Sequence, residues 1–126
     1  MATVSDYAIA TDEGATLQPG VEPTSRAFPF TVPDNANLGQ QAVATCMIVA
    51  DGSPRGLAWN LKVNGTQLRS FTHNQDQVSV IQEVFQGSVL RVGPNNATVT
   101  VTGGSGRLEI SDIVIHFQVE VASQAA

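Results

Sequence analysis

The sequence is poor in charge, in lysine and in cysteine. Charged residues make up 13% of its 126 residues, against a usual share of about 25%, and Lys62 is the only lysine. With 11 acidic and 6 basic side chains the net charge is −5, which argues against the basic surface of a nucleic-acid-binding protein. Cys46 is the single cysteine, so the chain forms no internal disulfide and no cysteine-based zinc cluster. Its apolar neighbours in 42–50 predict a small buried thiol.

The sequence also lacks a segment that would direct or anchor it. Its first residues contain neither a basic region nor an apolar region of a signal peptide. No run approaches the roughly 18 apolar residues of a membrane span. We therefore expect a chain that does not span a membrane and is either cytoplasmic or exported without a leader. A leader removed earlier would leave the same sequence.

Residues that favour strands are abundant. Val and Thr account for 16 and 11 residues, whereas Leu and Glu, which favour helices, account for 7 and 5. Hydrophobic residues reach 42%, which is enough for one core. Turn residues separate the apolar stretches about every 8–12 residues, as in all-β sandwiches. This predicts one all-β domain over 1–126, an antiparallel β-sandwich of jelly-roll type with about eight strands. Residues 1–25 would supply an N-terminal strand and a covering loop.

Several strands carry a clear pattern. Apolar residues alternate from Leu57 to Val63, and Asn64-Gly65 follows as a hairpin turn. Pro29 places the strand around it at a sheet edge. In the last strand, 107–121, the apolar parity changes near 111–112. One extra residue there restores the face, which predicts a β-bulge.

Two stretches resemble the galactose-binding-domain-like jelly rolls, which include carbohydrate-binding modules and accessory domains of glycosidases. One is 59–65, a strand that runs into Asn-Gly. The other is 90–101, with its Leu-x-x-Gly-x-Asn turn into a Thr/Val strand, followed by 108–115. The resemblance covers roughly residues 42–118. It implies the fold and sugar binding. The calcium and sugar ligands of the family lie in variable loops, and no residue of this sequence is matched to them.

The topology of a sandwich groups the loops into two ends, because consecutive antiparallel connections alternate between ends. Loops 51–56, 73–77 and 103–106 share one end, and loops 33–41, 64–65 and 86–96 share the other. The first end offers donors and acceptors together, as a neutral polyhydroxyl ligand requires. Its candidate ligand-binding residues are Asp51, Arg55, His73, Asn74, Gln75, Asp76 and Gln77. The second end gathers Asp34, Asn35, Asn37, Gln40, Asn64, Asn95 and Asn96. That both ends are only solvated loops stays an alternative.

Catalytic and metal-binding motifs are missing. The sequence contains no nucleophile elbow, phosphate-binding glycine loop or His-Glu-x-x-His pattern, so we expect no enzyme. Paired acids of a glycosidase can lie far apart in sequence, which keeps Asp51, Asp76 and Glu83 as an alternative. Segments 34–37 and 74–76 offer too few oxygens for calcium, which takes about 6–8. We expect no cofactor, with calcium as an alternative that no motif supports.

Two functions remain in view. One is a non-enzymatic binding module, for which the resemblance implies carbohydrate as the ligand. The other is a structural or assembly subunit of a capsid, tail, filament or surface layer, built from the same sandwich. Sparse charge, abundant Thr, Val and Gln on strand faces, and exposed strands such as 107–121, which would need an edge partner or protection, favour this second function. We expect carbohydrate or another protein as partner, and a homo-oligomer.

Overall fold

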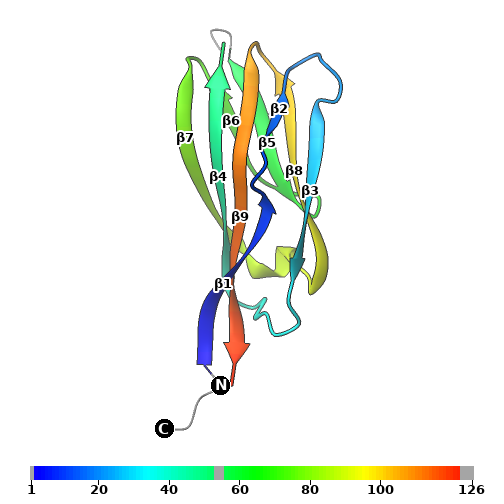
Figure 1. The fold of residues 1–126 in the computed structure, drawn as a ribbon, viewed down its shortest axis with the longest axis vertical. Helices are drawn as coiled ribbons and strands as arrows, with labels where there is room; N and C mark the ends of the chain where they lie inside the picture. Colours follow the sequence, from blue (N-terminus) through cyan, green and yellow to red (C-terminus); the bar gives the residue numbers. More distant parts are fainter. Residues whose placement is uncertain (1, 53–55, 123–126) are drawn as a thin grey trace.

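The computed structural model describes residues 2–52 and 56–122, which fold as two antiparallel sheets packed face to face (Figure 1). The strands are β1 (Ala2–Thr11), β2 (Ala15–Leu17), β3 (Ser25–Val32), β4 (Gln41–Asp51), β5 (Leu57–Val63), β6 (Thr66–His73), β7 (Gln77–Gln86), β8 (Gly93–Gly103) and β9 (Arg107–Val121), with one 3-10 turn, η1 (Gly87–Val89). One sheet has the order β1-β9-β4-β7, with β2 also beside β9, and the other has the order β3-β8-β5-β6. The predicted all-β antiparallel sandwich is confirmed. Within the described part of the chain no helix is long and apolar enough to cross a membrane.

The two sheets enclose one core. Alternating residues of the central strands point inward, which is why β5 and β8 alternate between buried and partly exposed positions. Trp59, Ile48 and Leu108 are among the largest side chains that are almost fully buried. Cys46 belongs to the same core, as predicted. Packing of these inner faces holds the sandwich together.

The change of parity in β9 is a β-bulge. Against β4, Asp112 pairs with Met47 and Ile110 pairs with Ile48, so Ser111 is the extra residue. Ile110 and Ile113 therefore both face the core, although an odd number of steps separates them. The predicted bulge is confirmed, and its cause is the need to keep one apolar face inward.

Two local features also agree with the sequence. Pro29 lies in β3, at the edge of its sheet, where the missing N–H leaves no gap in a ladder. Asn64 and Gly65 both have positive φ, 50° and 83°, and form the tight turn between β5 and β6.

Several details differ from the expectation. The described residues form nine strands, close to the predicted number of about eight, and the additional one is Ala15–Leu17, which pairs with β9. Strand β9 itself, expected to be exposed, lies between β1 and β4. The connection expected at 86–96 is shorter, since β8 already begins at Gly93. The expected loop 73–77 shrinks to 74–76, because its first and last residues belong to β6 and β7.

Candidate functional site

The three connections predicted to share one end of the sandwich do meet there. The backbone N–H of Gly52 donates to Asp76 Oδ1 at 2.6 Å, which joins the β4–β5 and β6–β7 connections. Ser105 Oγ donates to the Gly52 carbonyl at 3.4 Å, and a side chain at Gly104 would overlap the carbonyl of Gly56. We call residues 51–52, 56, 74–76 and 104–106 the first loop end. It is the upper end in Figure 1.

Two of its carboxylates hold the loops in place. Asp51 forms an ion pair with Arg107 across β4 and β9. The hydrogen bond to Asp51, and the charges of Asp51 and Glu109, raise the pKa of the Arg107 guanidinium. Asp76 accepts the Gly52 N–H and so fixes a turn whose Gly52 has φ of 68°. Both acids act here as positioning residues.

His73 is not a loop residue, which corrects the sequence-based expectation. It is the last residue of β6 and is 8% exposed. Its Nε2 accepts a hydrogen bond from Trp59 Nε1 at 2.9 Å, and its Nδ1 lies 3.3 Å from Gln77 Oε1. Gln77 donates in turn to Ser79 Oγ at 2.8 Å. His73 and Gln77 therefore support the 74–76 connection from inside the sandwich.

The two amide side chains at the tip of this end are exposed and form no hydrogen bond with the described residues. Asn74 and Gln75 are both exposed, and within the described ranges neither side chain has a hydrogen-bond partner. Each presents donor and acceptor atoms to solvent. Arg55, the remaining predicted residue, lies outside the described residues.

The second loop end differs because its amides are engaged. Asn95 is 1% exposed, and its Nδ2 donates to the carbonyls of Arg91 and Gly93. Asn64 Nδ2 donates to Asn95 Oδ1 at 2.7 Å and to the Val89 carbonyl at 3.0 Å. The amide network therefore fixes the turn at 64–65 against the connection before β8.

The amides in the connection before β4, residues 33–40, are also hydrogen-bonded within the protein. Asn37 Nδ2 donates to Glu120 Oε1 at 2.7 Å, and Asn35 Nδ2 donates to the Glu120 carbonyl at 3.0 Å. These amides fasten 33–40 to the end of β9. Exposed amides without such bonds occur at both ends. Asn74 and Gln75 are neighbours on one short connection at the first, whereas those of the second end are spread over three segments, at Gln40, Gln41, Gln86 and Asn96.

The three acids considered for glycoside hydrolysis each have a structural partner. Asp51 pairs with Arg107, and Asp76 accepts from Gly52. Glu83 in β7 lies 3.5 Å from the Arg69 guanidinium of β6. No oriented acid–base pair emerges from these contacts.

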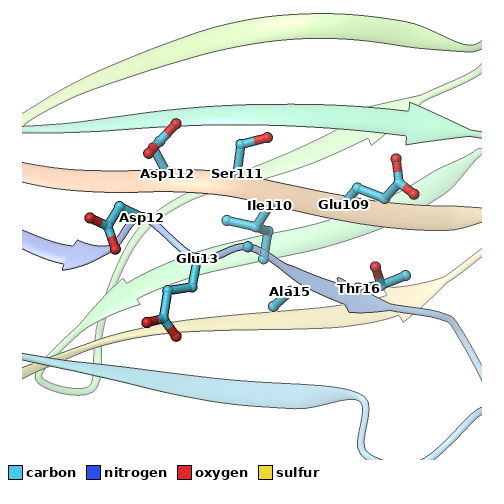
Figure 2. A pocket seen from close by; sticks show the side chains of 9 residues that line it. Asp12, Glu13, Ala15, Thr16, Glu109, Ile110, Ser111 and Asp112 are labelled. Carbon is cyan, nitrogen blue, oxygen red and sulfur yellow. The ribbon is translucent and has the colours of Figure 1, made fainter.

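Sequence reasoning missed a hollow of about 540 Å³ beside the β9 bulge. The turn after β1 and strand β2 form one wall, and Glu109 to Asp112 of β9 form the other (Figure 2). Figure 2 shows Asp12 and Asp112 at one end of the hollow and Glu109 at the other. The turn at 12–14 and the bulge were both visible in the sequence, but the pairing of β2 with β9 that joins them was not.

The hollow is acidic but does not form a metal site. Its lining contains four acids and no base, Asp12, Glu13, Glu109 and Asp112, so it repels anions. In the described ranges no three His, Cys, Asp or Glu side chains are grouped so that they could hold a metal ion. We therefore assign no calcium-dependent step to the described residues.

Comparison with known proteins gives structural matches alone. No protein-family model matches the sequence, and no curated protein matches it. BpGH86A, a β-porphyranase of glycoside hydrolase family 86 from Bacteroides plebeius, aligns with a TM-score of 0.65 and 18% identity over 96% of this chain. The match covers 21% of the hydrolase, so this chain spans about a fifth of that protein.

Other matches extend over whole modules. A family 35 carbohydrate-binding module from an environmental isolate aligns with a TM-score of 0.51 and 14% identity, over 98% of this chain and 100% of the module. A family 36 module, solved with calcium and xylotriose, aligns with a TM-score of 0.51 and 11% identity, over 90% of this chain and 98% of the module. At these identities the shared property is the fold. The resemblance to galactose-binding-like carbohydrate-binding modules is therefore confirmed at the level of the β-sandwich.

Proposed function

We propose that the chain is a non-enzymatic carbohydrate-binding module that binds a neutral glycan at the first loop end. The observation that carries this proposal is a pair of adjacent exposed amides on one short connection that its neighbours hold in place. Asn74 and Gln75 are exposed without internal partners, whereas the buried and strapping amides of the second end are engaged. The whole-length likeness to carbohydrate-binding modules supports it at the level of the fold.

In this proposal the residues divide into two roles. Asn74, Gln75 and Arg55 contact the glycan, because amides and a guanidinium offer the donors and acceptors that sugar hydroxyls need. Asp51, Asp76, His73 and Gln77 hold the connections that carry them. A site with preset loops loses less conformational entropy when it binds.

The proposed binding is weak. Among the described residues of this end no aromatic ring is exposed for stacking on a sugar. Three to four net hydrogen bonds of about 1 kcal/mol each give a Kd on the order of 1 mM. Such weak binding is effective on a polysaccharide, because the polymer presents many sites and raises the effective concentration of ligand near the module.

A glycan array with labelled protein, with and without calcium, tests the function. The panel includes xylotriose and porphyran fragments, and free sugar is added as competitor. Competable binding supports the proposal. Because the expected Kd is about 1 mM, the contradicting result is no binding to any of these glycans in a solution titration carried to about ten times that concentration. Binding that persists after chelation of calcium agrees with the absence of a metal site in the described residues.

Paired variants test the location. Asn74→Ala/Gln75→Ala removes the exposed amides of the first loop end. Gln40→Ala/Asn96→Ala is the matched control, because Gln40 and Asn96 are exposed amides of the second end. We expect the first variant to lose at least about tenfold in affinity and the control to bind normally. The reverse result would move the site to the other end.

A second function, assembly with further copies, is favoured by a different observation. One outer face of the sandwich carries many exposed apolar side chains.

A further inference from the structure

The outer face of the β1-β9-β4-β7 sheet carries several exposed apolar side chains, most of them on β7 and its neighbour β4. Its exposed large side chains are Tyr7, Ile9, Met47, Val78, Val80 and Val84, with exposed fractions from 43% for Met47 to 75% for Val78. Strand register places them on one face, since Met47 lies opposite Val80, and the half-buried Val43 and Val49 lie opposite Val84 and Val78. Exposed apolar side chains gathered on neighbouring strands, as on β4 and β7, are typical of interaction surfaces.

The charges on this face belong to β9 and to the end of β4, and the outward positions of β7 carry none. Asp51 and Arg107 pair where β4 ends and β9 begins, with Glu109 close by. Glu120 lies near the other end of β9, opposite Thr3. Asp112 lies in the middle of β9, opposite Met47. The outward side of β7 carries Val78, Val80, Gln82 and Val84 and no charge, so a second β7 strand meets no like charge there.

Strand β7 is the free edge beside this patch (Figure 1). Its ten residues include no Pro, Gly, Lys or Arg, and its register with β4 is unbroken. Its one charged residue, Glu83, pairs with Arg69 on the side facing β6. An edge of this composition is a template for another strand.

The edge strands β1, β3 and β6 each have a feature that hinders pairing with a further strand. Strand β3 contains Pro29, which cannot donate to a new ladder. Strand β6 has a register shift opposite Leu61 and Lys62. Strand β1 has a register shift after Ile9. Such devices are typical of edges that stay unpaired, and β7 lacks them.

We propose that β7 pairs with β7 of a second copy of this chain, antiparallel, about a two-fold axis at Ile81. In this register Val78 lies opposite Val84 of the partner subunit. Ser79, a hydroxyl donor, lies opposite Glu83 of the partner subunit, so no like charges meet. A shift that puts Gln82 on the axis instead sets Glu83 of the partner subunit against Ile81, which is unfavourable.

The pairing joins two sheets and continues the apolar face across both copies. Because the two β7 strands run in opposite directions, the two first loop ends point away from each other. If the proposed glycan site is correct, the dimer is bivalent and bridges two glycan chains. The dimer itself does not depend on that site, so either proposal can fail alone.

Sedimentation velocity over a range of protein concentrations tests the dimer. We expect the unmodified chain to shift from monomer to dimer as concentration rises. Val80→Lys places a lysine of each copy in the shared apolar face, and we expect the dissociation constant to rise more than about hundredfold. Val21→Lys is the matched control, since Val21 is also exposed, at 53%, but lies outside β7, and its dimer should persist. Circular dichroism of both variants verifies the fold.

Crosslinking tests the register. Val78→Cys/Val84→Cys places a thiol pair on each side of the axis, so mild oxidation should give a covalent dimer that a thiol reductant reverses. Val21→Cys should stay monomeric on the same denaturing gel. A chain that is monomeric at every concentration, a dimer that Val80→Lys leaves intact, or open-ended assemblies would each overturn the proposal.

Discussion

Trp59 Nε1 donates a hydrogen bond to His73 Nε2 at 2.9 Å, and both residues are buried. Because Nε2 is the acceptor, the ring proton of His73 is on Nδ1, where it faces Gln77 Oε1. The indole also stacks on Phe71 with 4.3 Å between ring centroids. This hydrogen bond joins Trp59, in the core, to His73 at the end of β6, which leads into the connection 74–76 of the first loop end.

Removing both partners of this pair should cost less than the sum of the costs of removing each one alone. Trp59→Phe or His73→Leu each leaves a buried polar atom unsatisfied, at about 1–3 kcal/mol beyond the change in packing. The double variant leaves neither atom, so its cost should be less than the sum of the single costs. Urea denaturation gives the three free energies of unfolding. Strict additivity would contradict the buried bond.

The close packing of the first loop end predicts a strong effect at Gly104. Gly104 and Gly65 have the same φ of 83°, so alanine at either site has a backbone cost of about 1–2 kcal/mol. A Cβ at Gly104 overlaps the backbone of Gly56, whereas one at Gly65 meets no atom within 4 Å. We expect Gly104→Ala to lower the free energy of unfolding clearly more than Gly65→Ala. Equal losses in chemical denaturation would show that the loops do not touch as described.

The two amide-bearing ends should respond in opposite ways to alanine. Asn64→Ala removes the bonds to the Val89 carbonyl and Asn95 and the acceptor for the Asn96 N–H. It should lower the free energy of unfolding by about 2–4 kcal/mol, with glycan binding unchanged below the transition. Asn74→Ala should leave stability within about 0.5 kcal/mol and weaken glycan binding. Thermal melts and glycan titrations of both variants test this crossed pattern, and the reverse pattern would refute it.

Burial raises the pKa of the Cys46 thiol from 9.0 to about 12. The folded state therefore keeps a proton that the unfolded state loses, and this contribution to stability is complete below pH 9. As pH rises from 9 towards 12 it is lost, at up to about 1.4 kcal/mol per pH unit. Cys46→Ala lacks the thiol, so its free energy of unfolding should fall less steeply over that range. Parallel urea titrations from pH 8 upward measure the difference, and identical slopes would contradict the burial.

Much of the fold could be predicted because it rests on local signals. Alternation from Leu57 to Val63, the Asn64-Gly65 turn, Pro29 at an edge and the bulge at Ser111 all follow from side-chain period and backbone preference. The connection of loops into two ends followed from strand reversal alone. These features need no knowledge of which strands are neighbours.

What failed depended on long-range pairing. The three residues of β2 are a strand because they meet β9 more than ninety residues later in the chain, and no local pattern marks them. From the sequence alone, His73 was predicted to be a polar loop residue. Its buried position depends on the hydrogen bond from Trp59, which is fourteen residues away in the chain. The acidic hollow likewise needs β2 and β9 together. Whether an amide side chain is hydrogen-bonded within the protein also depends on the folded structure. Asn64 and Asn74 both follow a predicted strand, but only Asn64 has such bonds among the described residues.

The central claim is that the first loop end binds a glycan, and NMR titration of the ¹⁵N-labelled chain with a glycan selected on the array tests it most directly. We predict saturable shifts of backbone amides confined to 51–52, 56, 74–76 and 104–106, absent in Asn74→Ala/Gln75→Ala. Shifts centred on 33–40, 64–65 and 87–92, or none at saturating sugar, would contradict the account.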